Sequence, residues 1–275
     1  MADSARTEAP QISIGQTERL GAPLGLRVDG VDVRTLDDET FLDLHRLFLE
    51  HHVLAISGQE LTPDEQIAFG ARWGELMPFP YGGLPSHPEI IPLLNSGKRR
   101  DVNQHWHSDM SYEAIPPKLS MLYCLEAPEI GGDTAFANQH LAYEELSLGL
   151  RNVVDQLQAE HSAAGVARIH GADPKDASRA THPVVRTHDE TGRKALYVCK
   201  AFVDRFADWS MRDSVALLGH LFEHGSRPEF QARVRWSAGD LVMWDNRSVQ
   251  HFAVHDHGDD QRLIHRLQVR GTTPV

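Results

Sequence analysis

The segment LVMWDNRSVQHFAVHDHGDDQRLIHRLQVR, residues 241–270, contains three runs of strand-forming residues separated by two polar turns. These runs predict strands at about 241–244, 249–254 and 262–270, because turn-forming residues bound each apolar or β-branched run. Several short strands in close succession are typical of barrels and double-sheet folds. The segment therefore favours a β-barrel or jelly roll over alternating βαβ units.

The remaining elements agree with this class. Further strands are predicted at 53–56, 119–125, 134–136 and 232–236, with a hairpin at 184–198 (tip 190–192) and short β-like pieces at 12–15 and 26–30. Helices are predicted at 41–51, 62–73, 140–158 and 210–224, and the second begins with a capping box formed by Thr62 and Glu65. The sequence lacks a glycine-rich phosphate loop. The expected fold is mainly β with peripheral helices.

Composition narrows the possible partners. The chain of 275 residues carries a formal net charge of -12, which repels nucleic acid and anionic membranes in the absence of a basic patch. No apolar run is long enough to span a membrane. We expect residues 1–10 to be a disordered tail without a signal peptide, and 11–275 to form one domain. Two cysteines, Cys124 and Cys199, fit a cytoplasmic protein without disulfides, and Cys124 is expected to be buried.

A possible metal site begins with the pair His107 and Asp109. Four His-x-Asp/Glu triplets occur in the chain: His87/Glu89, His107/Asp109, His188/Glu190 and His257/Asp259. The last two lie in predicted polar turns, and His87/Glu89 straddles a proline in a region rich in turns. Only His107/Asp109 has aromatic neighbours and is followed by a strand-like segment. If the triplet itself is a strand, residues two apart share a face, so the imidazole and the carboxylate would converge there.

His251, on the predicted strand 249–254, could complete a facial triad of two histidines and one carboxylate. Such a triad leaves three positions open on octahedral iron, as chemistry with O2 requires. Beyond it, alternation places Arg262, Ile264, Arg266 and Gln268 on one strand face. Arginine is a natural partner of carboxylates because its planar fork donates two hydrogen bonds at once. From the residues alone, it remains open whether both arginines face solvent instead.

Taken together, these motifs resemble the taurine dioxygenase/TfdA family of Fe(II)- and 2-oxoglutarate-dependent dioxygenases. The similarity extends from about residue 12 to 273. It rests on Trp106-His107-Ser108-Asp109, Gly131-Gly132-Asp133-Thr134, the segment 182–188, Trp244-Asp245-Asn246-Arg247 leading to His251, and arginines eleven and fifteen residues later. The resemblance implies a double-stranded β-helix (jelly-roll) core.

The resemblance also implies residue roles. His107, Asp109 and His251 would bind Fe(II), Thr134 and Arg262 would hold 2-oxoglutarate, and Trp244 would pack near the iron. Arg266 would bind an anionic group of the substrate, with Asn103 at the edge of the pocket. Phe79 stands where taurine dioxygenases carry a sulfonate-binding histidine, which argues against taurine. His182 and His188 would be structural and not ligands.

By the same resemblance, the reaction would use O2 to oxidise a small anionic substrate by hydroxylation or cleavage, releasing succinate and CO2. The protein would form a dimer or tetramer. Two alternatives remain. The first is a cupin-like metal enzyme that does not use 2-oxoglutarate, which would not need Thr134 or Arg262. The second is a non-catalytic small-ligand binding protein on the same fold, which would not need its three metal ligands.

Overall fold

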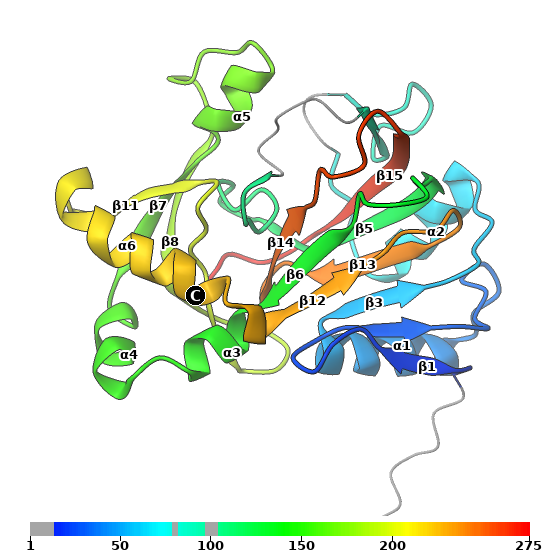
Figure 1. Cartoon of the computed structure of the whole chain (residues 1–275), viewed down its shortest axis with the longest axis horizontal. Helices are drawn as coiled ribbons and strands as arrows, with labels where there is room; N and C mark the ends of the chain where they lie inside the picture. Colours follow the sequence, from blue (N-terminus) through cyan, green and yellow to red (C-terminus); the bar gives the residue numbers. More distant parts are fainter. Residues whose placement is uncertain (1–13, 79–81, 97–103) are drawn as a thin grey trace, which may run out of the picture.

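A computed structural model describes residues 14–78, 82–96 and 104–275 (Figure 1). Its larger sheet has the strand order β1 (Thr17–Arg19), β2 (Leu26–Val28), β3 (Val53–Ile56), β13 (Leu241–Asp245), β5 (Pro117–Glu126), β15 (Gln261–Arg270) and β4 (Ile91–Ser96). Its neighbouring strands are antiparallel except for the parallel pair β2 and β3. The predicted strands at 241–244 and 262–270 are confirmed.

A smaller antiparallel sheet completes the jelly roll, with the order β12 (Gln231–Val234), β6 (Thr134–Asn138) and β14 (Val249–Ala253). Side chains of both sheets meet in one core, where Val242 and Trp244 of β13 pack with Phe136 of β6 and Val249 of β14. This double-stranded β-helix core is the fold class that the sequence indicated.

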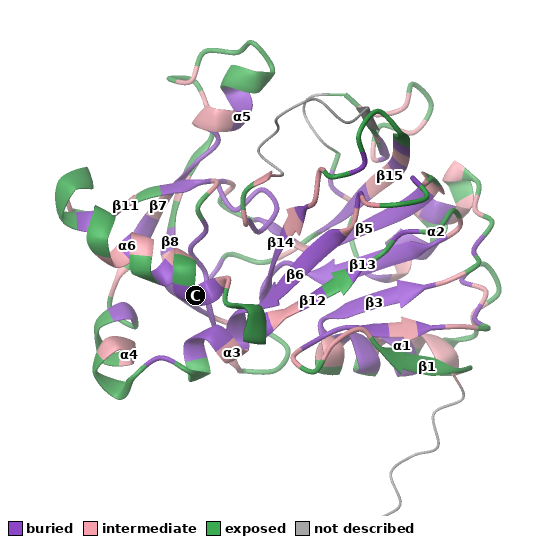
Figure 2. Ribbon diagram, in the orientation of Figure 1, coloured by how far each residue is buried: buried purple, intermediate pink, exposed green. Residues whose placement is uncertain are grey.

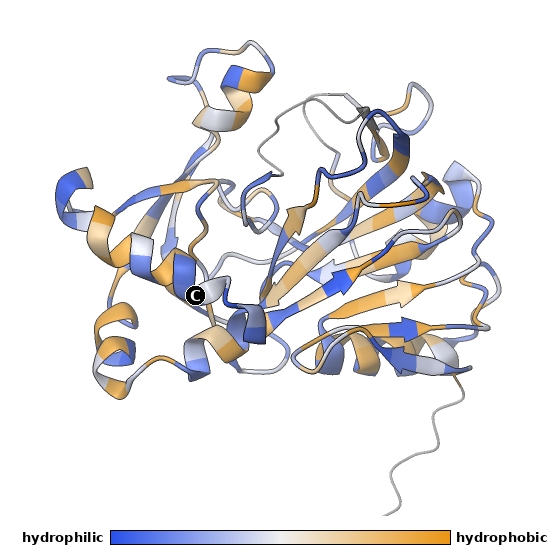
Figure 3. Ribbon diagram, in the orientation of Figure 1, coloured by the Kyte–Doolittle hydropathy of each residue, from blue (hydrophilic) through white to orange (hydrophobic). Residues whose placement is uncertain are grey.

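Helices α1 (Asp38–His51) and α2 (Pro63–Arg72) cover the other face of the larger sheet (Figure 1). Leu241 and Met243 of β13 pack against this helical layer, so the strand alternates between two buried faces. That is why its sequence is apolar without interruption, and why the central strands are buried and hydrophobic in Figures 2 and 3. The predicted capping box of Thr62 and Glu65 is present at the start of α2.

The segment between β6 and β12 folds beside the core around its own apolar cluster (Figure 1). It contains the sheet β11 (Val203–Phe206), β7 (Gln158–Ser162) and β8 (Arg179–Pro183), the hairpin β9 (Val185–Thr187) and β10 (Lys194–Leu196), and helices α3 (Gln139–Glu144), α4 (Leu148–Val154), α5 (Ala164–Ile169), α6 (Met211–Gly225) and η2 (Pro228–Phe230). The predicted hairpin and the predicted helix at 210–224 are confirmed.

Three predictions of secondary structure were wrong. The helix predicted at 140–158 is interrupted, because Ser147 caps a new helix, α4, and β7 begins at Gln158. Ile14 and Gly15 are not in a strand, and the first strand is β1; residues 12 and 13 lie outside the described part, as does the tail 1–10. The triplet around His107 is a loop and not a strand. Within the described ranges, no helix is both long and apolar enough to cross a membrane.

Candidate metal centre

Two segments far apart in sequence bring the predicted ligands together. His107 lies on a loop and forms an isolated β-bridge with His251, which is on β14. Each backbone N–H donates to the other residue's carbonyl, over 3.1 Å from His107 and 2.8 Å from His251. Asp109 follows in a tight turn, and the next residue, Met110, has a positive φ of 46°. Backbone pairing with β14 and this turn, rather than strand alternation, thus place the carboxylate beside both imidazoles.

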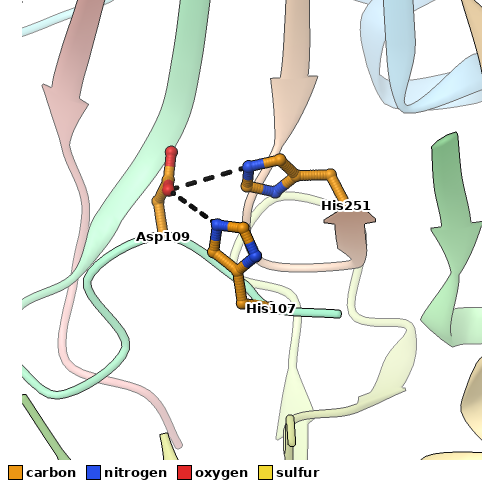
Figure 4. Close-up of side chains that lie close together, drawn as sticks. All are labelled: His107, Asp109 and His251. Carbon is orange, nitrogen blue, oxygen red and sulfur yellow. Dashed lines mark ion pairs between the residues drawn. The ribbon is translucent and has the colours of Figure 1, made fainter. Parts of the chain in front are cut away.

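The side chains of His107, Asp109 and His251 converge in a buried space (Figure 4). Asp109 Oδ1 lies 3.5 Å from His107 Nε2 and 3.8 Å from His251 Nε2, and the three candidate ligand atoms all lie within 4.8 Å of one another. This is the only such group of three or more His, Cys, Asp or Glu residues in the described part of the chain. Two imidazole nitrogens and one carboxylate oxygen form a donor set suited to a divalent transition metal.

The protonation states favour metal binding. Burial raises the pKa of Asp109, but His251, a hydrogen bond with His107 and the charge of Arg266 outweigh it and hold the pKa well below its ordinary value. Burial and the neighbouring His107 lower the pKa of His251 to about 3. His107 Nδ1 contacts the carbonyl oxygen of His105 at 2.8 Å, which places the proton on Nδ1 and leaves the Nε2 lone pair facing Asp109. The site therefore offers the anionic carboxylate of Asp109 and the neutral imidazole of His251, with His107 Nε2 directed at the same space.

Arg262 on β15 of the larger sheet and Thr134 on β6 of the smaller sheet also meet. Arg262 Nη2 donates to Thr134 Oγ1 over 3.2 Å, and the Trp236 indole donates to the same oxygen over 3.1 Å. The guanidinium lies over the Trp236 ring at 5.2 Å. Thr134 is two residues along β6 from Phe136, the residue opposite His251. Thr134 thus lies on the strand that pairs with β14, the strand that carries His251, while Arg262 reaches it from β15.

Within the part of the chain that the structure describes, Arg262 is a buried cation without a carboxylate in ion-pair distance. Its residue is 5% exposed, and among residues 14–78, 82–96 and 104–275 it forms no ion pair. Burial lowers the pKa of Arg262 to about 10, which still leaves it charged at neutral pH. An isolated buried charge is unfavourable unless it is paired, so this geometry calls for an anionic ligand. The alternative that both arginines face solvent is wrong for Arg262.

Arg266 and Trp244 lie beside the ligands themselves. Arg266 Nη1 is 3.7 Å from Asp109 Oδ1, and the Trp244 ring centroid is 4.5 Å from that of His251. Arg266 is partly buried, so it also faces inward. Asn103 and Phe79, the remaining predicted pocket residues, lie outside the described residues.

Three polar residues form a hydrogen-bond network around Asp109 that the sequence did not predict: Ser120, Asn246 and Gln268. Asp109 Oδ2 accepts hydrogen bonds from Ser120 Oγ and Gln268 Nε2, and Asn246 Nδ2 donates to Ser120 Oγ. The predicted strand alternation places Gln268 on the same face as Arg266, and this is the sequence feature that points to a position near the site. Ser120 sits inside an apolar run, where the sequence does not reveal its partners.

The competing triplets have other roles. His188 is buried, contrary to the expectation of an exposed turn, and its Nε2 pairs with Asp245 Oδ2 at 2.8 Å. His257 is also buried and contacts the Asp260 carbonyl through Nδ1. His182 contacts the carbonyl oxygen of Glu113 through Nε2. The polar turns predicted around His188 and His257 thus do not expose either histidine to water, although neither joins the metal-binding group.

Both cysteines are free and buried. Burial raises the pKa of the Cys124 thiol to about 12, so it is not a nucleophile at neutral pH. This agrees with its expected role as a buried packing residue.

Several known proteins are similar to this chain in sequence. The chain is 35% identical over 271 residues to the alkylsulfatase of Acinetobacter baylyi, covering 93% of this chain and 85% of that protein. It is 31% identical to the alpha-ketoglutarate-dependent sulfate ester dioxygenase of Pseudomonas putida, covering 100% and 96%. The alpha-ketoglutarate-dependent 2,4-dichlorophenoxyacetate dioxygenase of Cupriavidus pinatubonensis is 35% identical, over 82% of this chain and 86% of that one.

Solved structures give the same result. A taurine dioxygenase from Burkholderia xenovorans is similar with a TM-score of 0.83 and 34% identity, over 94% of this chain and 90% of that one. The structure of AAD-2 in complex with Mn(II) and N-oxalylglycine has a TM-score of 0.81 and 27% identity, over 95% and 99%. The family described as taurine catabolism dioxygenase TauD, TfdA family matches residues 14–268. With its fold, its converging ligands and these relatives taken together, the chain belongs to the TauD/TfdA family of dioxygenases.

Proposed function

We propose that this chain is an Fe(II)- and 2-oxoglutarate-dependent dioxygenase that oxidises a small organic anion, in the first place an alkyl sulfate ester. The observation that carries the reaction class is the presence of two buried features in the jelly-roll core. One is the buried triad of His107, Asp109 and His251, and the other is the buried, unmatched cation Arg262. A cupin-like enzyme without 2-oxoglutarate would have no use for that cation.

The triad would hold the iron by three ligands on one side. Bound there, Fe(II) would supply the activation of O2 and the oxidising power of the reaction. The protein's own contribution is to keep Asp109 ionised and His251 neutral, as their pKa shifts favour. The surrounding aromatic side chains, Trp244 and Phe136, exclude water from the histidine side of the site.

Arg262 and Thr134 would bind the distal carboxylate of 2-oxoglutarate. The guanidinium offers a planar fork, and Thr134 Oγ1 already accepts hydrogen bonds from Arg262 and Trp236, so its hydroxyl proton is free to donate to a carboxylate. Desolvation by the surrounding sheet strengthens this charge-assisted contact. The co-substrate is converted to succinate and CO2 during turnover.

Arg266 supports an anionic primary substrate, because its guanidinium is partly exposed and lies beside the metal-binding space, 3.7 Å from Asp109 Oδ1. A sulfate ester is favoured over taurine by two relatives named for sulfate esters and by Phe79, which stands where taurine dioxygenases carry a histidine. Oxidation of the carbon that bears the ester oxygen gives an unstable hydroxylated carbon. It collapses to an aldehyde and sulfate, with one O2 and one 2-oxoglutarate consumed.

A single assay tests the activity. The purified protein with Fe(II) and 2-oxoglutarate is given alkyl sulfates, phenoxyacetates or taurine, and succinate and sulfate are measured. Alkyl sulfates are expected to release succinate and sulfate in equal amounts. Turnover that needs no 2-oxoglutarate would establish the cupin-like alternative, and absence of turnover on every anion would favour a binding protein. If only phenoxyacetates release succinate, and no sulfate is formed, the substrate class would be the aryloxy acids, as the name of the relative from Cupriavidus indicates for that protein.

The remaining proposals concern organisation. Residues 11–275 would form one TauD/TfdA-like domain, which the single family match over 14–268 supports. We also propose a cytoplasmic enzyme with reduced cysteines and a dimeric or tetrameric assembly, the latter by resemblance to the family. Light scattering coupled to size-exclusion chromatography measures the assembly directly.

A further inference from the structure

The two carboxylate oxygens of Asp109 have different surroundings. Oδ1 faces His107 Nε2 at 3.5 Å, His251 Nε2 at 3.8 Å and Arg266 Nη1 at 3.7 Å. Oδ2 instead accepts hydrogen bonds from Ser120 Oγ at 2.6 Å and from Gln268 Nε2 at 3.0 Å. One oxygen is therefore presented to the metal-binding space, and the other is held by protein donors.

The direction of each hydrogen bond around Oδ2 follows from donor chemistry. Asn246 Oδ1 accepts from the Asp109 backbone N–H at 3.3 Å and from the Trp244 indole N–H at 2.9 Å, and both groups can only donate. This fixes the Asn246 amide, so its Nδ2 donates to Ser120 Oγ over 2.7 Å. Ser120 Oγ accepts a second hydrogen bond from Gln268 Nε2 over 3.0 Å. With both lone pairs of Ser120 used, its one proton must donate to Asp109.

The donors sit at fixed positions in the sheet. Ser120 on β5 is directly opposite Gln268 on the neighbouring strand β15 and opposite Trp244 on the other neighbour, β13. Ser120 is 0% exposed and Gln268 is 1% exposed. Central strands of a buried sheet are among the most rigid parts of a domain. The donors therefore cannot easily follow Asp109 if its carboxylate turns.

We propose that Ser120, Asn246 and Gln268 are positioning residues that restrict Asp109 to ligation of the metal through Oδ1 alone. This inference rests on the proposed function. Carboxylates bind metals through one oxygen or two. Octahedral iron with three protein donors has three positions left, which the two donor atoms of 2-oxoglutarate and one O2 would fill. A second oxygen from Asp109 would compete for one of them.

The test measures binding rather than turnover. Ser120→Ala and Gln268→Met each remove one donor to Oδ2, and Co(II) stands in for iron because its visible absorption reports coordination number. In both variants, 2-oxoglutarate should bind the Co(II) protein about tenfold to a hundredfold more weakly. The affinity for Co(II) itself should hold or rise, because a released carboxylate can chelate with both oxygens. The Co(II) spectrum before 2-oxoglutarate is added should also differ from that of the unchanged protein.

Two further variants separate positioning from a purely structural role. Ser120→Thr keeps the hydroxyl and should restore the binding of 2-oxoglutarate. Ser214→Ala is the matched control, because Ser214 is also 0% exposed and hydrogen-bonded, to Ser210 and Phe206 in the segment beside the core. It should leave the Co(II) spectrum and both affinities unchanged.

Three outcomes decide the question. Unchanged affinity for 2-oxoglutarate in Ser120→Ala and Gln268→Met would overturn the positioning role. Parallel losses of Co(II) and 2-oxoglutarate binding, with a melting temperature lowered as in Ser214→Ala, would overturn it too and leave a structural network. If the unchanged protein itself binds no 2-oxoglutarate and releases no succinate, the proposed function fails instead.

Discussion

Two buried arginines in this protein have opposite surroundings. Arg247, 1% exposed, follows β13, and its guanidinium contacts Asp245 at 2.7 Å, Asp189 at 2.6 Å and Glu190 at 2.5 Å. Arg262, 5% exposed, lies on β15 and forms no ion pair within the part of the chain that is described. Burial disfavours both charges, yet the carboxylates around Arg247 hold its pKa above the ordinary value, while that of Arg262 falls to about 10.

This difference separates structural from ligand-binding charge. The charge of Arg247 is neutralised within the protein, and with His188 and Asp245 it ties the β9–β10 hairpin to the turn that leads into β14. Within the described residues the charge of Arg262 forms no ion pair, which leaves it available to an anionic ligand. Buried cations of the first kind act on stability, and those of the second kind act on affinity for an anion.

Removing the paired arginine should have the largest effect. Arg247→Met leaves Asp245 buried without its main counter-charge, so the free energy of unfolding should fall by about 3–5 kcal/mol. Urea unfolding followed by circular dichroism measures this. A loss below about 1 kcal/mol would mean that the hairpin network is not structural.

The unpaired arginine should affect co-substrate binding next most strongly. Arg262→Met should weaken 2-oxoglutarate binding about 100-fold, since one charge-assisted contact with a buried carboxylate is lost. Titration calorimetry of the Mn(II) protein gives the dissociation constant. The matched variant Arg266→Met should leave this constant within a few-fold and instead raise the KM for the anionic substrate. Equal effects of the two variants on both ligands would contradict the separate roles.

In the absence of ligand, replacing Arg262 should change the stability of the protein much less than replacing Arg247. Arg262→Met removes a buried charge that forms no ion pair in the described structure, so the free energy of unfolding of the metal-free protein should change by about 1 kcal/mol or less. The same urea measurement as for Arg247→Met applies. A loss as large as that of Arg247→Met would show that Arg262 has a structural partner.

The last prediction concerns how the free energy of unfolding depends on pH in the acid range. Hydrogen bonds with His45 and Arg247 outweigh burial and lower the pKa of Glu190 from 4.5 to about 2. Because the folded pKa lies below the unfolded one, Glu190 stabilises the fold above about pH 4.5, and this contribution is lost as the pH falls toward 2. Glu190→Gln should therefore flatten the fall in unfolding free energy between these pH values. An unchanged slope would indicate that Glu190 keeps its ordinary pKa in the folded protein.

The sequence by itself determined the parts that depend on short-range rules. The Thr62 cap, the strands of residues 241–270 and the fold class follow from residue types a few positions apart. The resemblance added candidate roles for His107, Asp109 and His251, which the structure brings together. Local rules failed where a polar residue inside a pattern had a competing local role, as when Ser147 capped a new helix.

Only the tertiary structure decided which charges are matched. Arg247 and Arg262 are both arginines close to β-strands, and no local pattern tells them apart. Arg247 meets Asp189 and Glu190 because the β9–β10 hairpin folds against the turn after β13, and Ser120 meets Gln268 because β5 and β15 are neighbours. Pairings between residues so distant in sequence depend on strand order and register, which chain spacing does not encode. These long-range pairings determine that the charge of Arg247 stabilises the fold, whereas the charge of Arg262 is available to bind a ligand.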